Sequence, residues 1–358
     1  MRESVTIVLW ALCLCAGTLL ADRGPEPRPL PPGKGLILPI QDRAGSPDTV
    51  EYLSLLTRQS LSESGAQLTE VVGLRDSLRR MRIREATTAT SEKLLQLSRI
   101  LGTDWLVSTT LHELVREPIP QITLSAQIFR PETTTLDWSG FVSMTGLDRQ
   151  TWLGLGEVDS LDELLRRAIG ELFADFASGP SGSPKKRLPH SKHGFLREPV
   201  PPSTSGAVAV IPFDSIVDRD ALRVAELQTR AWIAALDRGG FRVVRPGAVH
   251  QVMRERGQLL LGEVDRSTAL ELATRLGVEW VLTGTVETYK TGSGLLPDPW
   301  VAIGARLIHS DSGRIFWSDG RERQGSDSQT LFQQGRIYSA ADLSLEMVHS
   351  MIAGFSKP

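Results

Sequence analysis

The sequence predicts an α/β (α+β) fold made of two tandem copies of a mixed β-sheet domain with packed helices. The first observation is a repeat, because three blocks occur twice in the same order: LILPIQ (36–41) and AVIPFD (209–214), ILGTDWLVSTTLHE (100–113) and RLGVEWVLTGTVET (275–288), LSAQIFRPETTTLDWSG (124–140) and IGARLIHSDSGRIFWSDG (303–320). The spacing between matching positions changes only from 173 to 179 residues, as small loop insertions would produce.

The second observation is the order of periodic segments in the second copy. Short β-branched runs predict strands at 207–213, 241–245, 279–289, 299–309 and 314–324. Apolar residues at helical spacing predict helices near 220–238, 246–256, 267–276 and 339–355. The resulting order is β-α-β-α-α-β-β-β-α, with helices early and an antiparallel meander late.

The first copy has much the same order. We expect strands near 35–40, 104–115, 121–130 and 134–144, and helices near 48–64, 73–83, 91–101 and 158–176. Because each copy carries its own strands and helices, we expect each to fold alone.

The domain boundaries follow from composition. Residues 1–21 predict a signal peptide, because Arg2 is followed by a mostly apolar run from Val5 to Ala21, and an uncleaved anchor is the alternative. Residues 22–34 are a Pro-rich stalk, 35–178 the first copy, 179–205 a Pro/Gly/Ser-rich basic linker and 206–358 the second copy. Both cysteines, Cys13 and Cys15, lie in the expected signal peptide, without the small preceding residue of a lipoprotein signal.

Several residues recur in both copies, and we interpret them as structural: Pro39, Gly102, Trp105, Trp138, Pro212, Gly277, Trp280 and Trp317. We interpret Phe213 and Gly284 of the second copy as structural as well. The repeated tryptophans would suit a platform for stacking sugars. Their presence in both copies favours a shared packing role instead, because each copy must fill the same core.

The second copy reads VAVIPF, then GGFRVVRPGAVHQVM, then LATRLGVEWVLTGTVETY. It resembles a family of bacterial envelope domains that includes the curli-secretion protein CsgG, the N-terminal domain of TolB and the penicillin-binding-protein activator LpoB. The resemblance covers residues 206 to about 320, and in the first copy Ile40 and Thr109 replace Phe213 and Gly284. It implies assembly, secretion or activator roles through protein contacts, and it supplies no catalytic residues.

Sequence motifs for chemistry are missing. No phosphate-binding loop and no G-x-S-x-G elbow occurs, and cysteine ligands are confined to the expected signal peptide. We therefore predict no catalytic residues, no cofactor and no metal. A net charge of −2 offers no general attraction for nucleic acid.

The linker carries a local positive cluster, made of Lys185, Lys186, Arg187, Lys192 and Arg197. It could contact peptidoglycan or an anionic surface polymer, or it could only keep the linker extended and soluble.

These observations predict an exported protein of the periplasm or outer cell surface. The leading hypothesis is a non-catalytic binding or scaffold protein that joins other envelope proteins in an assembly, secretion or activator complex and that could form oligomers. One alternative is an envelope hydrolase with an unrecognised carboxylate site, which requires carboxylates converging in a deep pocket. Another is a component of an outer-membrane secretion channel, although the hairpin arms are short and charged for that role.

Overall fold

The computed structural model describes residues 29–148, 156–178, 194–196, 206–217, 220–257, 265–292, 294, 296–329 and 335–355. The expected signal peptide lies outside these residues, as do most of the expected stalk and linker.

The first half forms one mixed sheet and four helices within the described residues. Its elements are β1 (Gly35–Ile37), β2 (Gln41–Asp42), α1 (Pro47–Glu63), α2 (Leu74–Arg80), α3 (Ser91–Leu101), β3 (Trp105–Val115), β4 (Gln121–Phe129), β5 (Trp138–Thr145) and α4 (Leu161–Ser178). The strand order is β1-β3-β4-β5, with β2 also beside β3. Strands β1 and β2 run parallel to β3, and the other pairs are antiparallel.

The second half follows the same plan. Its elements are β7 (Ala207–Val210), β8 (Asp214–Ser215), α5 (Ala221–Arg238), β9 (Arg242–Val243), α6 (Pro246–Glu255), α7 (Arg266–Leu276), β10 (Val278–Lys290), β11 (Trp300–His309), β12 (Ile315–Gln324), a short 3-10 helix (Gly325–Ser328) and α8 (Ala340–Phe355). The strand order is β6-β12-β11-β10-β7-β9, where β6 is Gly194–Leu196, and β8 lies beside β10. The mixed α/β architecture predicted from the sequence is confirmed.

The two sheets agree in register as well as in strand order. A bulge interrupts β3 between Leu111 and Glu113, and one interrupts β10 at the matching place, between Val286 and Thr288. These matching irregularities are what a duplication would leave, and the duplication itself stays a prediction.

The structure explains why the predicted first strand of each half is split in two. Pro39 lies between β1 and β2, and Pro212 lies between β7 and β8. A proline has no N–H to donate, so the ladder stops there and resumes along the same neighbouring strand.

One strand was not expected. Gly194–Leu196 forms β6, inside the predicted linker, and pairs antiparallel with residues 317–319 of β12.

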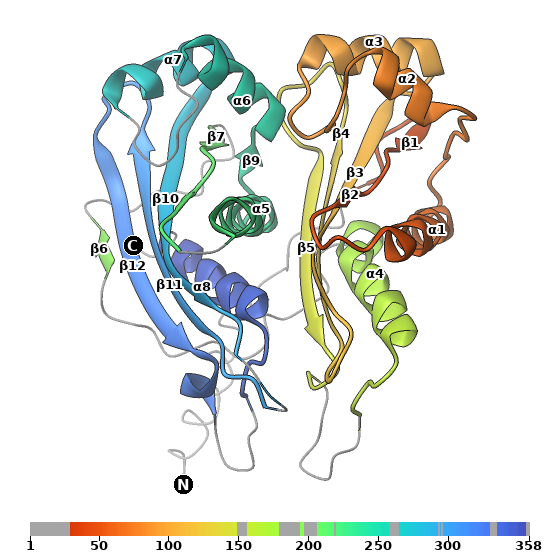
Figure 1. Cartoon of the computed structure of the whole chain (residues 1–358). Helices are drawn as coiled ribbons and strands as arrows, with labels where there is room; N and C mark the ends of the chain where they lie inside the picture. Colours follow the sequence, from red (N-terminus) through yellow and green to blue (C-terminus); the bar gives the residue numbers. More distant parts are fainter. Residues whose placement is uncertain are drawn as a thin grey trace, which may run out of the picture.

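The elements stack in four layers (Figure 1). The second sheet comes first, then α5 and α8, then the first sheet, and then α1 and α4. Helices cover both faces of the first sheet, and strand β3 contributes buried side chains to each face. Its odd positions, including Trp105, Val107 and Leu111, join the core formed with α1 and α4, while the even positions Ser108 and Thr110 face the second half.

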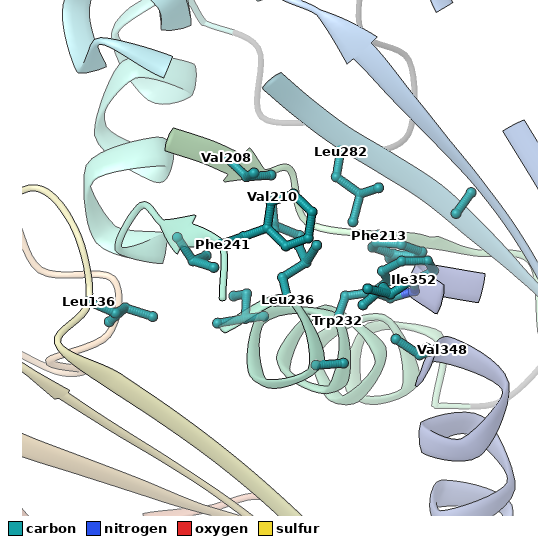
Figure 2. Packing of buried hydrophobic residues seen from close by; sticks show 14 of the residues in the cluster. Leu136, Val208, Val210, Phe213, Trp232, Leu236, Phe241, Leu282, Val348 and Ile352 are labelled. Atoms are coloured by element: carbon teal, nitrogen blue, oxygen red, sulfur yellow. The ribbon is translucent and has the colours of Figure 1, made fainter. Parts of the chain in front are cut away.

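The largest core belongs to both halves. It combines Leu36, Leu106 and Phe129 of the first half with residues of the second half such as Trp232 and Phe241. Figure 2 shows part of this cluster around α5.

The backbone also crosses between the halves. The N–H of Leu136 donates to the carbonyl of Val243 at 2.8 Å, and the N–H of Arg245 donates to the carbonyl of Thr134 at 2.8 Å. Separation of the halves would therefore expose apolar surface on both. That each half folds alone stays a prediction.

Candidate functional site

The structure places the four repeated tryptophans in the core, with at most 4% of each exposed. The indole N–H of Trp105 donates to the carbonyl of Gly33 at 3.2 Å. Trp138 stacks on Phe173, while Trp280 and Trp317 each meet another ring edge-on. None of the four is placed to stack on a sugar at the surface.

The other repeated positions lie at turns and close contacts. Gly102 ends α3 and Gly277 ends α7, with φ angles of 62° and 64° that favour glycine. Phe213 is fully buried and lies against Gly284. The basic cluster of Lys185, Lys186, Arg187, Lys192 and Arg197 lies outside the described residues, so its contact with an anionic polymer stays a prediction.

The polar face of the first sheet forms the contact between the halves. Its buried polar residues are Ser108, Thr110, His112, Thr123, Ser125, Gln127, Ser139 and Ser143. On α5, Asp237 accepts a bond from the N–H of Ser139 at 3.0 Å, and Arg230 donates to Gln127 at 3.0 Å. Sequence alternation alone would leave such a face in solvent, whereas here α5 and α8 bury it.

A group of charges closes one side of this contact. Arg43 of the first half donates to Glu85 at 2.7 Å and to Glu226 of α5 at 2.8 Å, and Arg230 lies 3.7 Å from Glu226. Burial alone would raise the pKa of Glu226, but Arg230 and Arg43 lower it below its ordinary value. Each charge therefore has an opposite partner, which is the condition for burying ions without a large cost.

A second polar link joins β3 to β10. The Tyr289 hydroxyl donates to Glu113 at 2.8 Å, and Thr123 and Gln121 donate to the same carboxyl group at 3.1 and 3.4 Å. Burial raises the pKa of Glu113 even though these hydrogen bonds oppose the rise. Burial also raises the pKa of Tyr289 well above its ordinary value. The hydrogen bond between Tyr289 and Glu113 joins the two halves near the C-terminal ends of β3 and β10.

His112 and Ser125 are the nearest approach to a hydrolytic pair in this contact. His112 Nε2 lies 2.8 Å from Ser125 Oγ, but only 3% of each residue is exposed. Burial lowers the pKa of His112 to about 3, so the ring is a weak base at neutral pH. We therefore interpret this hydrogen bond as a structural one, which satisfies two buried polar groups in the contact between the halves.

A cavity of about 230 Å³ lies beside α1, and its lining has no ionisable side chain. The lining consists of Leu30, Pro31, Pro32, Gly33, Gly65, Ala66, Gln67 and Trp105. It offers none of the carboxylates that the hydrolase alternative requires.

Two absences hold for the part of the chain that the structure describes. No group of three or more His, Cys, Asp and Glu side chains is placed to hold a metal ion there. Among the same residues, every helix is too short or too polar to cross a bilayer.

The outer face of the second sheet is equivalent in register to the buried polar face of the first sheet. Helices α6 and α7 cover its upper part, where Val281 and Ile308 are buried. Beyond them lies a surface that we call the open sheet face, formed by Thr285, Glu287, Lys290, Trp300, Gly304, Arg306, Ser318, Gly320 and Glu322. Glu287, Lys290, Arg306, Gly320 and Glu322 are exposed and the others are half-buried.

Matching registers align the open sheet face with the polar face of the first sheet. Arg306 takes the place of Gln127, and Ser318 takes the place of Ser139. Sequence reasoning missed this surface, although the repeat contained a signal. Positions that hold Ser, Gln and His in the first copy hold Gly, Arg and Glu in the second.

No family model matches the sequence, and a search of curated proteins finds no match. Several solved structures are similar to part of the chain. The PelC dodecamer from Paraburkholderia phytofirmans is 15% identical, covers 46% of this chain and 96% of its own, and has a TM-score of 0.30. Lipoprotein GNA1162 from Neisseria meningitidis is 18% identical, with 40% and 99% covered and a TM-score of 0.31. The LpoB C-terminal domain from Salmonella enterica is 20% identical, with 33% and 82% covered and a TM-score of 0.24.

The structural neighbours of this chain thus include LpoB and a bacterial lipoprotein, and each of them covers less than half of this chain. The finer resemblance to CsgG and TolB stays a prediction.

Proposed function

We propose that this chain is a non-catalytic binding protein of the bacterial envelope, and that it binds a protein partner through the open sheet face. One observation carries the proposal. The equivalent face of the first sheet is itself a protein-binding surface, because α5 and α8 of the second half cover it.

The open sheet face keeps the chemistry of such a contact. It is polar, and it offers Glu287, Arg306 and Glu322 as exposed charges. Trp300 lies half-buried at its lower end, where the ammonium group of Lys290 sits 4.5 Å from the ring centre and Glu322 accepts the indole N–H at 2.7 Å. An aromatic ring with charged neighbours is typical of residues that contribute strongly to protein interfaces.

Export is part of the proposal, and its support is the apolar run within residues 1–21. N-terminal sequencing of the protein purified from cells should begin near Asp22, in an envelope fraction. Recovery of Met1 from the cytosolic fraction would contradict export.

The binding role is tested by photocrosslinking in the producing bacterium. A photoreactive amino acid replaces Lys290 on the open sheet face, which leaves Arg306, Glu287 and Glu322 in place, and in a control it replaces Arg99, an exposed residue on α3. We expect a crosslinked protein adduct from position 290 and none from position 99. Without an adduct at 290, or with equal adducts at both positions, the proposed function is wrong.

A further inference from the structure

A row of small residues crosses the middle of the open sheet face. Gly304 pairs with Thr285 on β10 and with Gly320 on β12. A Cβ added at Gly320 would meet nothing within 4 Å, and one at Gly304 would meet only a Glu287 carboxylate oxygen at 4.0 Å. The two glycines therefore leave the backbone uncovered by their own side chains, and another surface can approach it closely.

Charges of opposite sign lie on the two sides of this row. Arg306 lies two residues from Gly304 in one direction along β11. In the other direction, Glu322 is paired with Ala302, and Glu287 lies in the bulge of β10 opposite the same residue. Lys290, which lies over the ring of Trp300, is farther along on the side of the two glutamates. The face is thus positive on one side of the row, and on the other side the two glutamates outnumber this lysine.

We propose that the open sheet face binds the same face of a second copy of this chain, around a two-fold axis that runs across the strands along the row Thr285–Gly304–Gly320. The inference rests on the proposed function and names its partner. In such an interface one patch meets itself, and each contact occurs twice.

Charge placement selects this axis. Rotation about a line across the strands exchanges the two sides of the row, so Arg306 comes between Glu287 and Glu322 of the second copy. Rotation about a line along β11 would instead place Arg306 against Arg306 of the second copy. Like charges in contact oppose association, whereas the first arrangement is complementary at both of its ends.

Charge also argues against repeating the internal contact from chain to chain. Helices α1 and α5 align by the glycines that follow them, Gly65 and Gly240, with φ angles of 87° and 84°. Arg223 of α5, which donates to a carbonyl of β3, then corresponds to Asp48 of α1. If α1 of a second chain lay on the open sheet face as α5 lies on the first sheet, Asp48 would approach Glu287. The face-to-face pairing has no such conflict.

Sedimentation equilibrium of the mature chain tests the proposal by charge exchange. We expect the unsubstituted protein to form a dimer. Arg306→Glu and the double variant Glu287→Arg/Glu322→Arg should each weaken self-association by about a hundredfold or more, because both place like charges together. An equimolar mixture of these two variants should form a mixed dimer, since each then meets its opposite.

Two further variants test whether the effect is specific to the open sheet face. Gly320→Tyr fills the glycine row at an exposed position with free space, so it should stay folded by circular dichroism and yet lose the dimer. Arg99→Glu on α3 is the matched control and should remain a dimer.

An unsubstituted protein that is monomeric at every concentration would overturn the inference, and so would variants that all stay dimeric. Crosslinking separates this failure from failure of the proposed function. An adduct at 290 with a different protein removes only the second copy as partner, whereas the lack of any adduct removes the binding role as well.

Discussion

The ring of Phe213 occupies the space that a side chain at Gly284 would need. A Cβ built on Gly284 would lie 2.3 Å from Cε1 of Phe213 and 2.4 Å from the carbonyl oxygen of Gly304. The matching positions of the first half hold Ile40 and Thr109, both buried. Ile40, which lies between β1 and β2, is smaller than Phe213, and Thr109 on β3 is larger than Gly284, so the two positions are coupled through packing.

Gly284→Thr should destabilise the protein by about 1–3 kcal/mol, because it overfills a packed core. Phe213→Ile alone should cost about 1 kcal/mol or more through lost burial. The double variant, which restores the pair of the first half, should cost less than the sum, as measured by urea unfolding in a double-mutant cycle. Some cost should remain, because the Gly304 carbonyl is also close. A double variant that is simply additive would show that the positions are independent.

The sequence was sufficient for the strands and helices of each half. Short β-branched runs and apolar residues at helical spacing predicted the element order of each half, but not the division of the first strands at Pro39 and Pro212 or the strand β6. The repeat added the expectation that the two sheets share one plan.

The contact between the halves could not be predicted in the same way. The alternation in β3 that places Ser108, Thr110 and His112 on one face is the pattern of a strand with a solvated side. Serine and threonine suit either solvent or a hydrogen-bonded interface, so no local signal showed that α5 would cover them. Charged neighbours on distant segments, such as Arg43 and Glu226, come together only in the folded chain.

Trp280→Ala should damage folding. The side chain is 4% exposed and packs edge-on against Phe316 and His309, so its loss should cost about 3–5 kcal/mol. The measurement is urea unfolding of the whole chain. Trp300→Ala on the open sheet face is the matched control and should cost much less, because Trp300 is half-buried. An unchanged midpoint for Trp280→Ala would contradict the packing role.

Tyr289→Phe should weaken the contact between the halves. It removes a hydroxyl that donates to the buried Glu113 carboxyl at 2.8 Å, and a buried group that loses its partner typically costs about 1–3 kcal/mol. The same substitution in a Glu113→Gln background should cost less, because the acceptor has already changed. Thermal unfolding of the four proteins measures the difference. Equal costs in both backgrounds would show that the hydrogen bond does not contribute.

Acid should destabilise the protein through His112. Burial lowers its pKa to about 3, while in the unfolded chain a histidine takes up its proton near pH 6.5. Below pH 6.5 the unfolded state therefore binds one more proton than the folded state, so stability falls as pH falls toward 3. Burial lowers the pKa of His349 to about 4, which acts in the same direction, whereas the raised pKa of Glu113 acts in the opposite one.

The contribution of His112 is separated by substitution. His112→Gln keeps a group that can bond to Ser125 and removes the titration, so the loss of stability between about pH 6.5 and pH 5 should shrink by roughly 2 kcal/mol. Urea midpoints across this range give the slope for each protein. His309→Gln, at a half-buried position on β11, is the matched control and should leave the His112 contribution in place. If His112→Gln has the slope of the unsubstituted protein, then the ring does not stay neutral in the contact between the halves, and another group causes the loss in acid.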